Sequence, residues 1–174
     1  MHQRDFKMAM RDLRVYPDPV LKKRARSVEK VDDDIRRLLD DMAETLYAQP
    51  GIGLAAPQVG VLLRVIVVDV SSRDKNGRLI GLVNPEIVWS EGSIPYEEGC
   101  LSVPGMTVEI DRKERVRVAA LDREGRPVEI PADGLLAIAL QHELDHLEGR
   151  LIIDQVSWLK RDLYRRKMKK AVAD

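Results

Sequence analysis

The sequence has little cysteine and few aromatic residues. Its single cysteine, Cys100, cannot close a disulfide within the chain, so the cysteine content gives no sign of an oxidising compartment. Phe, Trp and Tyr make up 4% of the 174 residues, and the core must therefore be mainly aliphatic. No run approaches the roughly 20 apolar residues of a membrane span, and the first ten residues lack the apolar segment of a secretory signal. We expect a cytoplasmic protein with no membrane partner.

An excess of charge of either sign is also lacking. Lys and Arg total 29, and Asp and Glu total 29. A balanced chain has no overall attraction to nucleic acid, so DNA is not an expected partner. Charged residues make up 33% and apolar residues 44%, which is typical of a globular protein. At this length we expect a single domain over residues 1–174, with a flexible tail at about 1–10.

The apolar pattern predicts an α+β domain built mostly from antiparallel strands. A first helix is expected after an N-cap at Asp32, because apolar residues then recur at helical spacing: Ile35, Leu38, Leu39, Met42 and Leu46. Apolar or alternating runs predict strands at 62–70, 79–85, 86–90, 115–122 and 128–132, and "KNGR" (75–78) predicts a hairpin turn. The stretch "GIGLAAPQVG" (51–60) has too few large side chains for an ordinary strand.

A second helix is predicted at 133–148, with Asp133 placed to cap its start and Gly149 placed to follow its end. Apolar residues occupy most of its circumference, which is typical of a buried helix: Leu135, Leu136, Ile138, Ala139, Leu140, Leu144 and Leu147. We expect the strands to pack around this central helix. A third helix, rich in Lys and Arg, is expected at about 157–172.

The central helix carries "QHELDHLEG" (141–149), which is typical of a metal site. His142 and His146 are four positions apart, so they share one face of the helix and can hold one ion. Glu143 directly follows the first histidine. A catalytic site of this type usually has three protein ligands and an open position for water. The third ligand is not in the motif itself.

Downstream residues do not supply the third ligand in either familiar way. The pattern HExxHxxGxxH would place a histidine at Ile152, which cannot bind a metal, and no glutamate follows Glu148. Upstream, Cys100 in "EEGCLSVPG" is the one strong candidate, and a thiolate with two imidazoles suits zinc, iron or cobalt. The alternative is an inert cysteine of the core, which is common for a lone thiol.

Three motifs together resemble those of the bacterial peptide deformylases. "GIGLAAPQVG", "EGCLS" and "QHELDH" follow in the family's order, and the likeness runs from "VYPDPVL" through "LIIDQVSWLK". The resemblance implies an enzyme that hydrolyses the N-formyl group from the initiator methionine of new polypeptides and releases formate. It also implies that Cys100, His142 and His146 are the ligands. Most sites of this kind bind zinc more tightly than ferrous iron, which favours zinc. The resemblance implies Fe²⁺ instead, with Ni²⁺, Co²⁺ or Zn²⁺ as substitutes.

The resemblance further implies roles for the residues around the metal. Glu143 would transfer the proton of the attacking water to the leaving amine, while the Gln58 amide and the Leu101 backbone N–H would stabilise the oxyanion. A substrate-binding pocket would comprise Gly51, Ile52, Gly53, Glu98, Gly99, Leu135, Ile138 and Ala139, with Glu98 near its rim. For the apolar members of this set, ordinary core packing is the alternative. Asp145 should point away from the metal, with Arg112 as an expected partner.

Other functions remain open at this point. An arginine that some relatives carry after the second motif is missing, since this chain has "GMTV" there. The HELDH motif alone would also fit a zinc endopeptidase. A non-catalytic relative would be expected to lack Glu143, Gln58 or a ligand, and a structural metal module would need a fourth protein ligand.

The basic C-terminal segment permits two interpretations. From Ser157 to Asp174 only two residues are acidic, and seven are basic: Lys160, Arg161, Arg165, Arg166, Lys167, Lys169 and Lys170. The helix is either a solvated surface element docked through Trp158, Leu159 and Leu163, or a surface for phosphates. Because formylated chains emerge at the ribosome, the resemblance favours weak ribosome binding through this helix.

Overall fold

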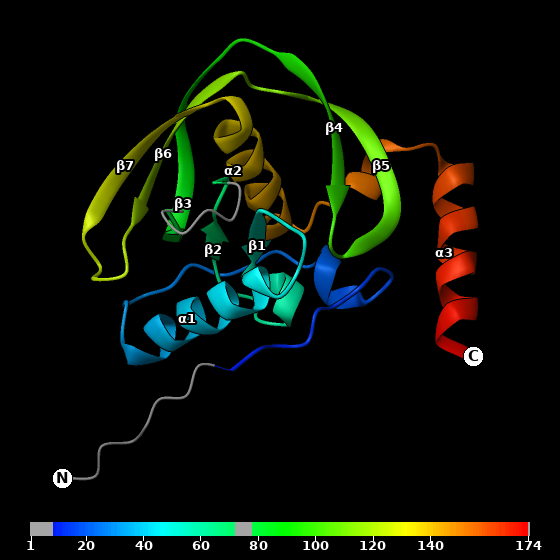
Figure 1. Ribbon diagram of the computed structural model, residues 1–174, viewed down its shortest axis with the longest axis horizontal. Helices are drawn as coiled ribbons and strands as arrows, with labels where there is room; N and C mark the ends of the chain where they lie inside the picture. The colour runs from blue at the N-terminus through cyan, green and yellow to red at the C-terminus, as the bar shows by residue number, and fades with distance from the viewer. Residues whose placement is uncertain (1–8, 72–77, 174) are drawn as a thin grey trace, which may run out of the picture.

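The computed structural model describes residues 9–71 and 78–173 (Figure 1). Within these ranges it contains the helices α1 (Asp33–Tyr47), α2 (Gly134–Leu147) and α3 (Trp158–Ala173). Its strands are β1 (Gly53–Ala55), β2 (Val65–Val68), β3 (Ile80–Glu91), β4 (Ile94–Cys100), β5 (Val103–Arg112), β6 (Arg115–Leu121) and β7 (Pro127–Asp133). All strand pairings are antiparallel, so the predicted α+β class is confirmed.

The strands form two sheets that lie on different sides of α2. One sheet has five strands in the order β1-β2-β3-β6-β7, and the other is the ribbon β4-β5. In Figure 1, α2 occupies the centre of the molecule, with β7, β6 and β3 to one side and β4 and β5 to the other. Leu140 and Leu147 of α2 are fully buried against Ile66, Val68 and Val118 of the larger sheet. The prediction of a central buried helix is therefore confirmed.

The termini of the first two helices follow local chemistry. The Asp32 carboxylate accepts a hydrogen bond from the Ile35 N–H at 3.1 Å, which confirms the predicted N-cap of α1. Asp133 occupies the predicted N-cap position of α2 and is also the last residue of β7, but its side chain accepts no capping bond. Gly149 follows α2 with φ of 72°, and a Cβ there would lie 2.5 Å from the Lys22 carbonyl oxygen. Only glycine fits that position.

The predicted strands are present, but two of their boundaries differ. The runs 79–85 and 86–90 join in one strand, β3, which contains a register shift between Val83 and Glu86. Asn84 lies at this irregularity with φ of 52°, and its amide bonds both the N–H and the C=O of Val28. The strand predicted at 62–70 is shorter, Val65–Val68. Most of the predicted "KNGR" turn, like most of the N-terminal tail, lies outside the described residues.

The sequence pattern did not predict the ribbon β4-β5, nor the short strand β1, which lies in the stretch 51–60 that was not expected to form an ordinary strand. Pro95, Gly99, Pro104 and Gly105 interrupt the ribbon, and such residues are unusual within strands. Its inner face nevertheless alternates correctly and forms a separate core with the chain that follows α2: Val103, Met106, Val108, Ile110, Leu151, Ile152 and Ile153. This ribbon matters because its strand β4 ends at Cys100.

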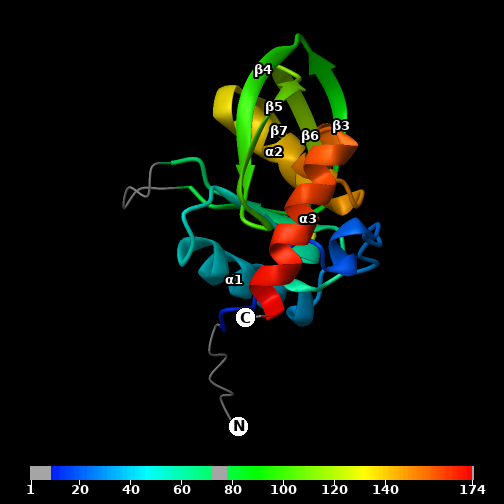
Figure 2. The same ribbon diagram turned by 90° about the vertical axis from the view of Figure 1, so that its right-hand side faces the viewer.

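Helix α3 stands along the outer side of the molecule, as the two ribbon views show (Figures 1 and 2). Its Tyr164 hydroxyl donates to the Pro104 carbonyl oxygen at 2.7 Å, and the Tyr164 ring lies 6.1 Å from that of Tyr16. The expected docking residues are exposed instead: Trp158 by 72%, Leu159 by 60% and Leu163 by 58%. That expectation is wrong. In the part of the chain that is described, no helix is long and apolar enough to cross a membrane.

Candidate active site

The three expected metal ligands converge from two elements. Cys100 is the last residue of β4, while His142 and His146 lie one turn apart on α2. The candidate ligand atoms of the three residues lie within 4.8 Å of one another, and Cys100 Sγ is 3.4 Å from His146 Nε2. A thiolate and two imidazoles at this separation suit a divalent transition metal with an open position. Among the described residues the group has three members, and a structural site would need a fourth.

Buried charges hold the first histidine in place from behind. His142 Nδ1 lies 2.8 Å from Glu98 Oε1, which leaves the other ring nitrogen free for a metal. Arg112 binds both oxygens of Glu98, at 2.5 and 2.8 Å, and its third nitrogen binds Asp145 at 2.7 Å. Burial opposes ionisation of Glu98, but the bonds from Arg112 and His142 outweigh it and lower the pKa of Glu98. The expected Arg112–Asp145 pair is confirmed.

The second histidine has a different environment. His146 Nε2 faces the Cys100 sulfur, while its Nδ1 is buried and has no hydrogen-bond partner among the described residues. Burial lowers the pKa of His146 well below its ordinary value, so the ring is neutral. A neutral imidazole is the form that binds a metal.

Glu143 is buried beside the metal ligands. Its Oε2 atom has no partner within the described chain, and the residue is 3% exposed. Burial is the main reason why the pKa of Glu143 is raised to about 7. The backbone of β1 lies against this carboxylate, since a Cβ on Gly53 would be 2.6 Å from Glu143 Oε1. A carboxylate with such a pKa can accept and return a proton near neutral pH.

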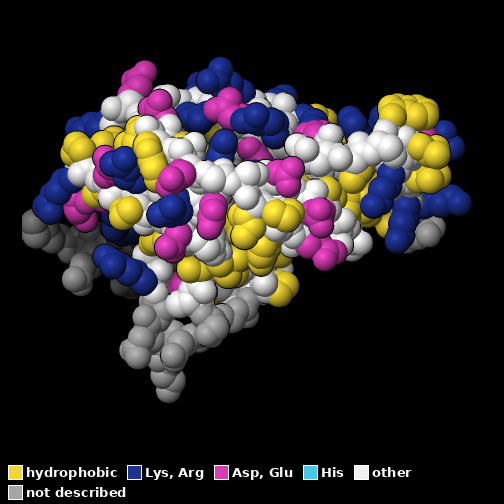
Figure 3. Space-filling model, turned by 90° about the horizontal axis from the view of Figure 1, so that it is seen from above, with side chains coloured by type: hydrophobic (Ala, Val, Ile, Leu, Met, Phe, Trp, Pro, Cys, Tyr) yellow, Lys and Arg dark blue, Asp and Glu magenta, His cyan; other side chains and the backbone are white. Residues whose placement is uncertain are grey.

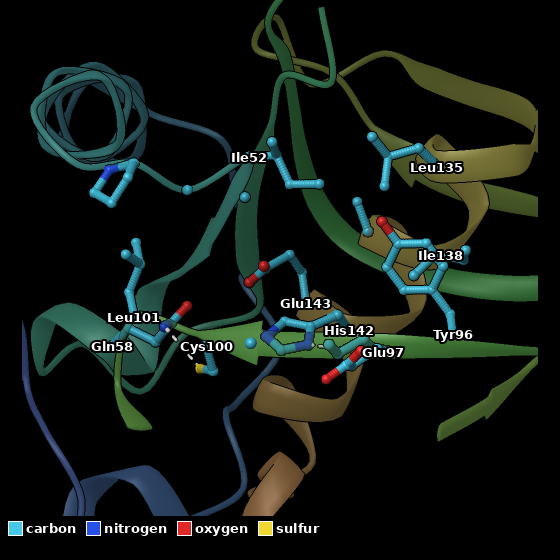
Figure 4. A pocket seen from close by; sticks show the side chains of 16 residues that line it. Ile52, Gln58, Tyr96, Glu97, Cys100, Leu101, Leu135, Ile138, His142 and Glu143 are labelled. Carbon is cyan, nitrogen blue, oxygen red and sulfur yellow. Dashed lines mark hydrogen bonds and ion pairs between the residues drawn. The ribbon is translucent and has the colours of Figure 1, made fainter. Parts of the chain in front are cut away.

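The Gln58 amide is held in one orientation. It lies in the 3₁₀ helix Ala56–Val59 and is 1% exposed. Its Oε1 accepts from the Ala55 N–H at 2.9 Å, while its Nε2 donates to Ser102 Oγ at 3.1 Å and lies 3.8 Å from the Cys100 sulfur. Because the oxygen is already engaged, the NH₂ group is the end directed to the cysteine (Figure 4). Ser102 was not among the predicted site residues, although it is the last letter of "EGCLS".

A cavity of about 390 Å³ opens beside these groups, although His146 is not one of its lining residues. Every residue predicted to bind substrate lines it: Gly51, Ile52, Gly53, Glu98, Gly99, Leu135, Ile138 and Ala139. Gln58, Leu101, Cys100, His142 and Glu143 line it too. Figure 4 shows Ile52 and Leu135 at one end and Cys100 and Gln58 at the other. Ile138 and Ala139 are buried, whereas Ile52 and Leu135 are 36% and 38% exposed at the opening.

Three lining residues were missed by the sequence reasoning: Pro50, Tyr96 and Glu97. Pro50 precedes the first motif, and Tyr96 and Glu97 precede the second. Their nearness to the motifs was the one indication in the sequence that they could line the site. Because β4 was not predicted, the sequence did not show which side chains face the cavity. Glu98 has an added role, since its carboxylate is engaged by Arg112 and His142 and is not free at the rim.

Comparisons with known proteins match nearly the whole chain to peptide deformylases. The family model for polypeptide deformylase matches residues 10–162. A peptide deformylase of Thermodesulfovibrio yellowstonii is 58% identical over 162 residues, which is 93% of this chain and 98% of that protein. A crystal structure of a peptide deformylase from Legionella pneumophila aligns with a TM-score of 0.86 at 48% identity and covers 95% of this chain and 96% of that one. A peptide deformylase from Ehrlichia chaffeensis, in complex with actinonin, aligns with a TM-score of 0.88 at 41% identity, over 94% and 98% of the two chains.

Proposed function

This chain belongs to the polypeptide deformylase family, and from that premise we propose that the cavity beside Cys100, His142 and His146 is its active site. The family removes the N-formyl group from nascent peptides in a metal-dependent hydrolysis, and this chain is a hydrolase of that kind. The observation that carries the assignment of the site is the convergence of one thiol and two imidazoles beside a buried carboxylate.

We propose that Cys100, His142 and His146 hold one divalent ion. When bound, such an ion supplies a Lewis acid that polarises the formyl carbonyl and lowers the pKa of a water molecule. The mixed sulfur and nitrogen set accepts Fe²⁺, Ni²⁺, Co²⁺ or Zn²⁺. Following the family resemblance, we propose Fe²⁺ as the physiological ion. The Glu98 carboxylate orients the His142 ring for this role.

Glu143 is proposed as the acid–base residue. Its free oxygen is buried beside the ligands, so it can accept the proton of the attacking water and deliver it to the leaving amine. The formyl carbon gains the water oxygen and loses the amine, and the products are formate and a free amino terminus. The raised pKa of Glu143 suits both transfers near neutral pH.

Two donors are proposed for the oxygen that becomes negative in the transition state. The Gln58 NH₂ group is directed toward Cys100, and its orientation is fixed by Ala55 and Ser102. The Leu101 backbone N–H follows the cysteine directly, and Leu101 lines the cavity. Donors whose positions are set before the reaction need no rearrangement as the charge develops.

The substrate is proposed to enter as an extended chain. β1 is an edge strand of the larger sheet, so its outer side can pair with a peptide backbone. Gly51 and Gly53, with no side chains, permit a close approach. The methionine side chain would then lie in the apolar part of the cavity, against Ile52, Leu135, Ile138 and Ala139.

The test of this function is formate release from a formyl-methionyl peptide under anaerobic conditions, with metal analysis of the same sample. We expect stoichiometric formate and about one equivalent of metal per chain. The same peptide without its formyl group serves as the control for endopeptidase activity. Cleavage of that control at an internal bond, without formate release from the formylated peptide, would refute the proposal.

We also propose that α3 binds the ribosome, where nascent chains emerge, and that the enzyme therefore acts in the cytoplasm. Figure 3 shows dark-blue basic side chains together with yellow apolar ones on the projection at its right, which is α3. Within the described chain, Arg166 is the one basic residue of α3 paired with a carboxylate, Asp162 at 2.9 Å. Unpaired basic side chains on an exposed helix can neutralise phosphates of RNA.

A further inference from the structure

The loop 48–52 forms one side of the opening of the cavity. It joins the end of α1 to the start of β1, and Pro50, Gly51 and Ile52 all line the cavity. Figure 4 shows Ile52 across the opening from Leu135. A Cβ on Gly51 would lie 2.9 Å from the Leu101 side chain, so the loop is packed directly on a neighbour of Cys100. The position of this loop therefore sets the shape of the space that a substrate enters.

A single residue outside the cavity fastens both ends of this loop. Asp69 follows β2, and its backbone N–H donates to the Ile52 carbonyl oxygen at 2.8 Å. Its side-chain Oδ2 accepts from the Tyr47 hydroxyl at 2.6 Å, and Tyr47 is the last residue of α1. Tyr47 immediately precedes the loop and Ile52 ends it. The Asp69 main chain thus holds the exit of the loop, while its side chain holds the entry.

Asp69 and Tyr47 act together as a clamp on the loop 48–52, and Asp69 is itself held in place and charged. Asp69 is 7% exposed, and its Oδ1 accepts from the Ser71 backbone N–H at 3.0 Å and from the Ser71 hydroxyl. Burial opposes its ionisation, but the bonds from Ser71 and Tyr47 outweigh burial and lower the pKa of Asp69. Burial, reinforced by Asp69, raises the pKa of Tyr47 to about 12, so the phenol remains a donor. A charged acceptor makes this one of the stronger types of hydrogen bond.

We propose that Tyr47 and Asp69 are positioning residues that hold the loop 48–52 in the conformation that receives the formylated substrate. Neither residue lines the cavity, so both act through the loop. The ligands, Glu143 and Gln58 are held separately by α2, β4 and the 3₁₀ helix at 56–59. Loosening the loop should therefore weaken substrate binding more than it slows the chemical step. The inference rests on the proposed function of the cavity.

Three substitutions test the clamp. Tyr47→Phe removes one hydroxyl and keeps the ring, and Asp69→Asn keeps the shape but places an NH₂ group against one of the three donors. Tyr164→Phe is the matched control, because it removes another hydroxyl that donates at 2.7 Å, to Pro104 and away from the loop. Each variant is checked by thermal melting and metal content before kinetics. If Tyr47→Phe does not fold, Asp69→Asn tests the proposal. If Asp69→Asn does not fold, Tyr47→Phe tests it.

For a short formyl-methionyl peptide, we expect Tyr47→Phe and Asp69→Asn to raise KM about three- to tenfold, since the net contribution of a typical intramolecular hydrogen bond corresponds to a factor of about this size. We expect kcat to stay within about twofold, because a uniform loss of binding leaves the chemical step intact. Amide hydrogen exchange across residues 48–53 should accelerate in both variants and not in Tyr164→Phe. The effect of the double variant should be smaller than the sum of the two single effects, because the Tyr47–Asp69 bond is common to both.

Unchanged KM and unchanged exchange in a folded clamp variant would overturn the proposal. A fall in kcat with constant KM would overturn it as well, since the loop would then serve the chemistry and not binding. If the unmodified enzyme releases no formate, the proposed function of the cavity fails. Exchange across 48–53 still decides in that case whether Tyr47 and Asp69 hold the loop.

Discussion

Helices α2 and α3 are similar in length but opposite in setting. α2 has 14 residues and lies in the centre of the molecule, where even Gln141, Glu143 and His146 are buried. α3 has 16 residues and stands on the outside, with Trp158, Leu159 and Leu163 exposed. Both carry functional proposals. The two helices differ in how strongly position constrains those proposals.

A polar group on a buried helix has few permitted roles. It must be paired, bind a ligand, or take part in chemistry, because an unsatisfied group inside a protein is unfavourable. His142 is paired with Glu98, whereas Glu143 keeps one oxygen free. The basic residues of α3 other than the partly buried Arg161 are exposed and can be satisfied by water in any arrangement. The sequence pattern of α2 is therefore far more informative than the seven basic residues of α3.

The largest expected effect is on α2, from Glu143→Gln. The amide cannot accept the proton of water, so kcat should fall by about 10²- to 10⁴-fold. The metal content should be unchanged, because Glu143 is not among the three candidate ligands. Steady-state kinetics and metal analysis of one sample measure both quantities. Near-native turnover would show that another residue moves the proton.

A comparable loss is expected from Cys100→Ala, with a different signature. Removing the thiolate leaves two of the three candidate ligands, so metal content should fall together with activity. Titration with Co²⁺ and equilibrium dialysis measure the affinity of the site. If this variant bound one equivalent of metal with native affinity, Cys100 would be a core thiol.

A smaller effect is expected from Glu98→Gln, because Glu98 contacts the proposed ligand His142 and is not itself a ligand. A neutral amide is a weaker acceptor for the His142 ring and loses the charge that Arg112 binds, so metal affinity should fall about 10- to 100-fold. Glu97→Gln is the control, because Glu97 is exposed and bonds Thr107. The rate of metal loss to a chelator separates the two variants. Equal rates would mean that Glu98 only stabilises the ribbon.

Features that depend on residues close together in the chain could be predicted from the sequence, whereas contacts between distant segments could not. His142 and His146 belong to one helix, so their spacing was enough to bring the rings together. Cys100 meets them through pairing of β4 with β5, which prolines and glycines obscure in the sequence. The Cys100 assignment therefore needed the resemblance to a family. The same ribbon places Glu98 against Arg112, a contact that no local pattern reveals.

The sheet shows the same limit. The apolar run of β2 and the alternation of β6 were recognised, because each is a property of one segment. The order β1-β2-β3-β6-β7 is set by contacts between distant segments and could not be derived from them. The clamp of Tyr47 on Asp69 joins residues 22 positions apart for the same reason. The single-segment signals fixed the elements, and their assembly decided the site.

The smallest effect on catalysis is expected for α3, from truncation after Ser157. The helix contacts the rest of the molecule through Tyr164, which bonds Pro104 and lies near Tyr16. None of the residues of α3 lines the cavity, so hydrolysis of small formyl peptides should stay within about twofold of the full chain. Binding to ribosomes should behave differently. Full-length protein should sediment with ribosomes at low salt and dissociate at moderate salt, because phosphate contacts are salt-sensitive. The truncated protein should not sediment at either salt concentration.

A variant that reverses charge separates basic attraction from packing. Replacing Lys167, Lys169 and Lys170 by Glu leaves Tyr164 and its contacts in place, so folding and peptide hydrolysis should persist while sedimentation is lost. Changing Glu124 and Glu129, which lie away from α3 on β7 and the turn before it, to Gln is the matched control and should not weaken sedimentation. If the truncated and full-length forms sediment equally, or if neither sediments at low salt, α3 is a packing element. Of the two helices, only the buried α2 would then carry a function.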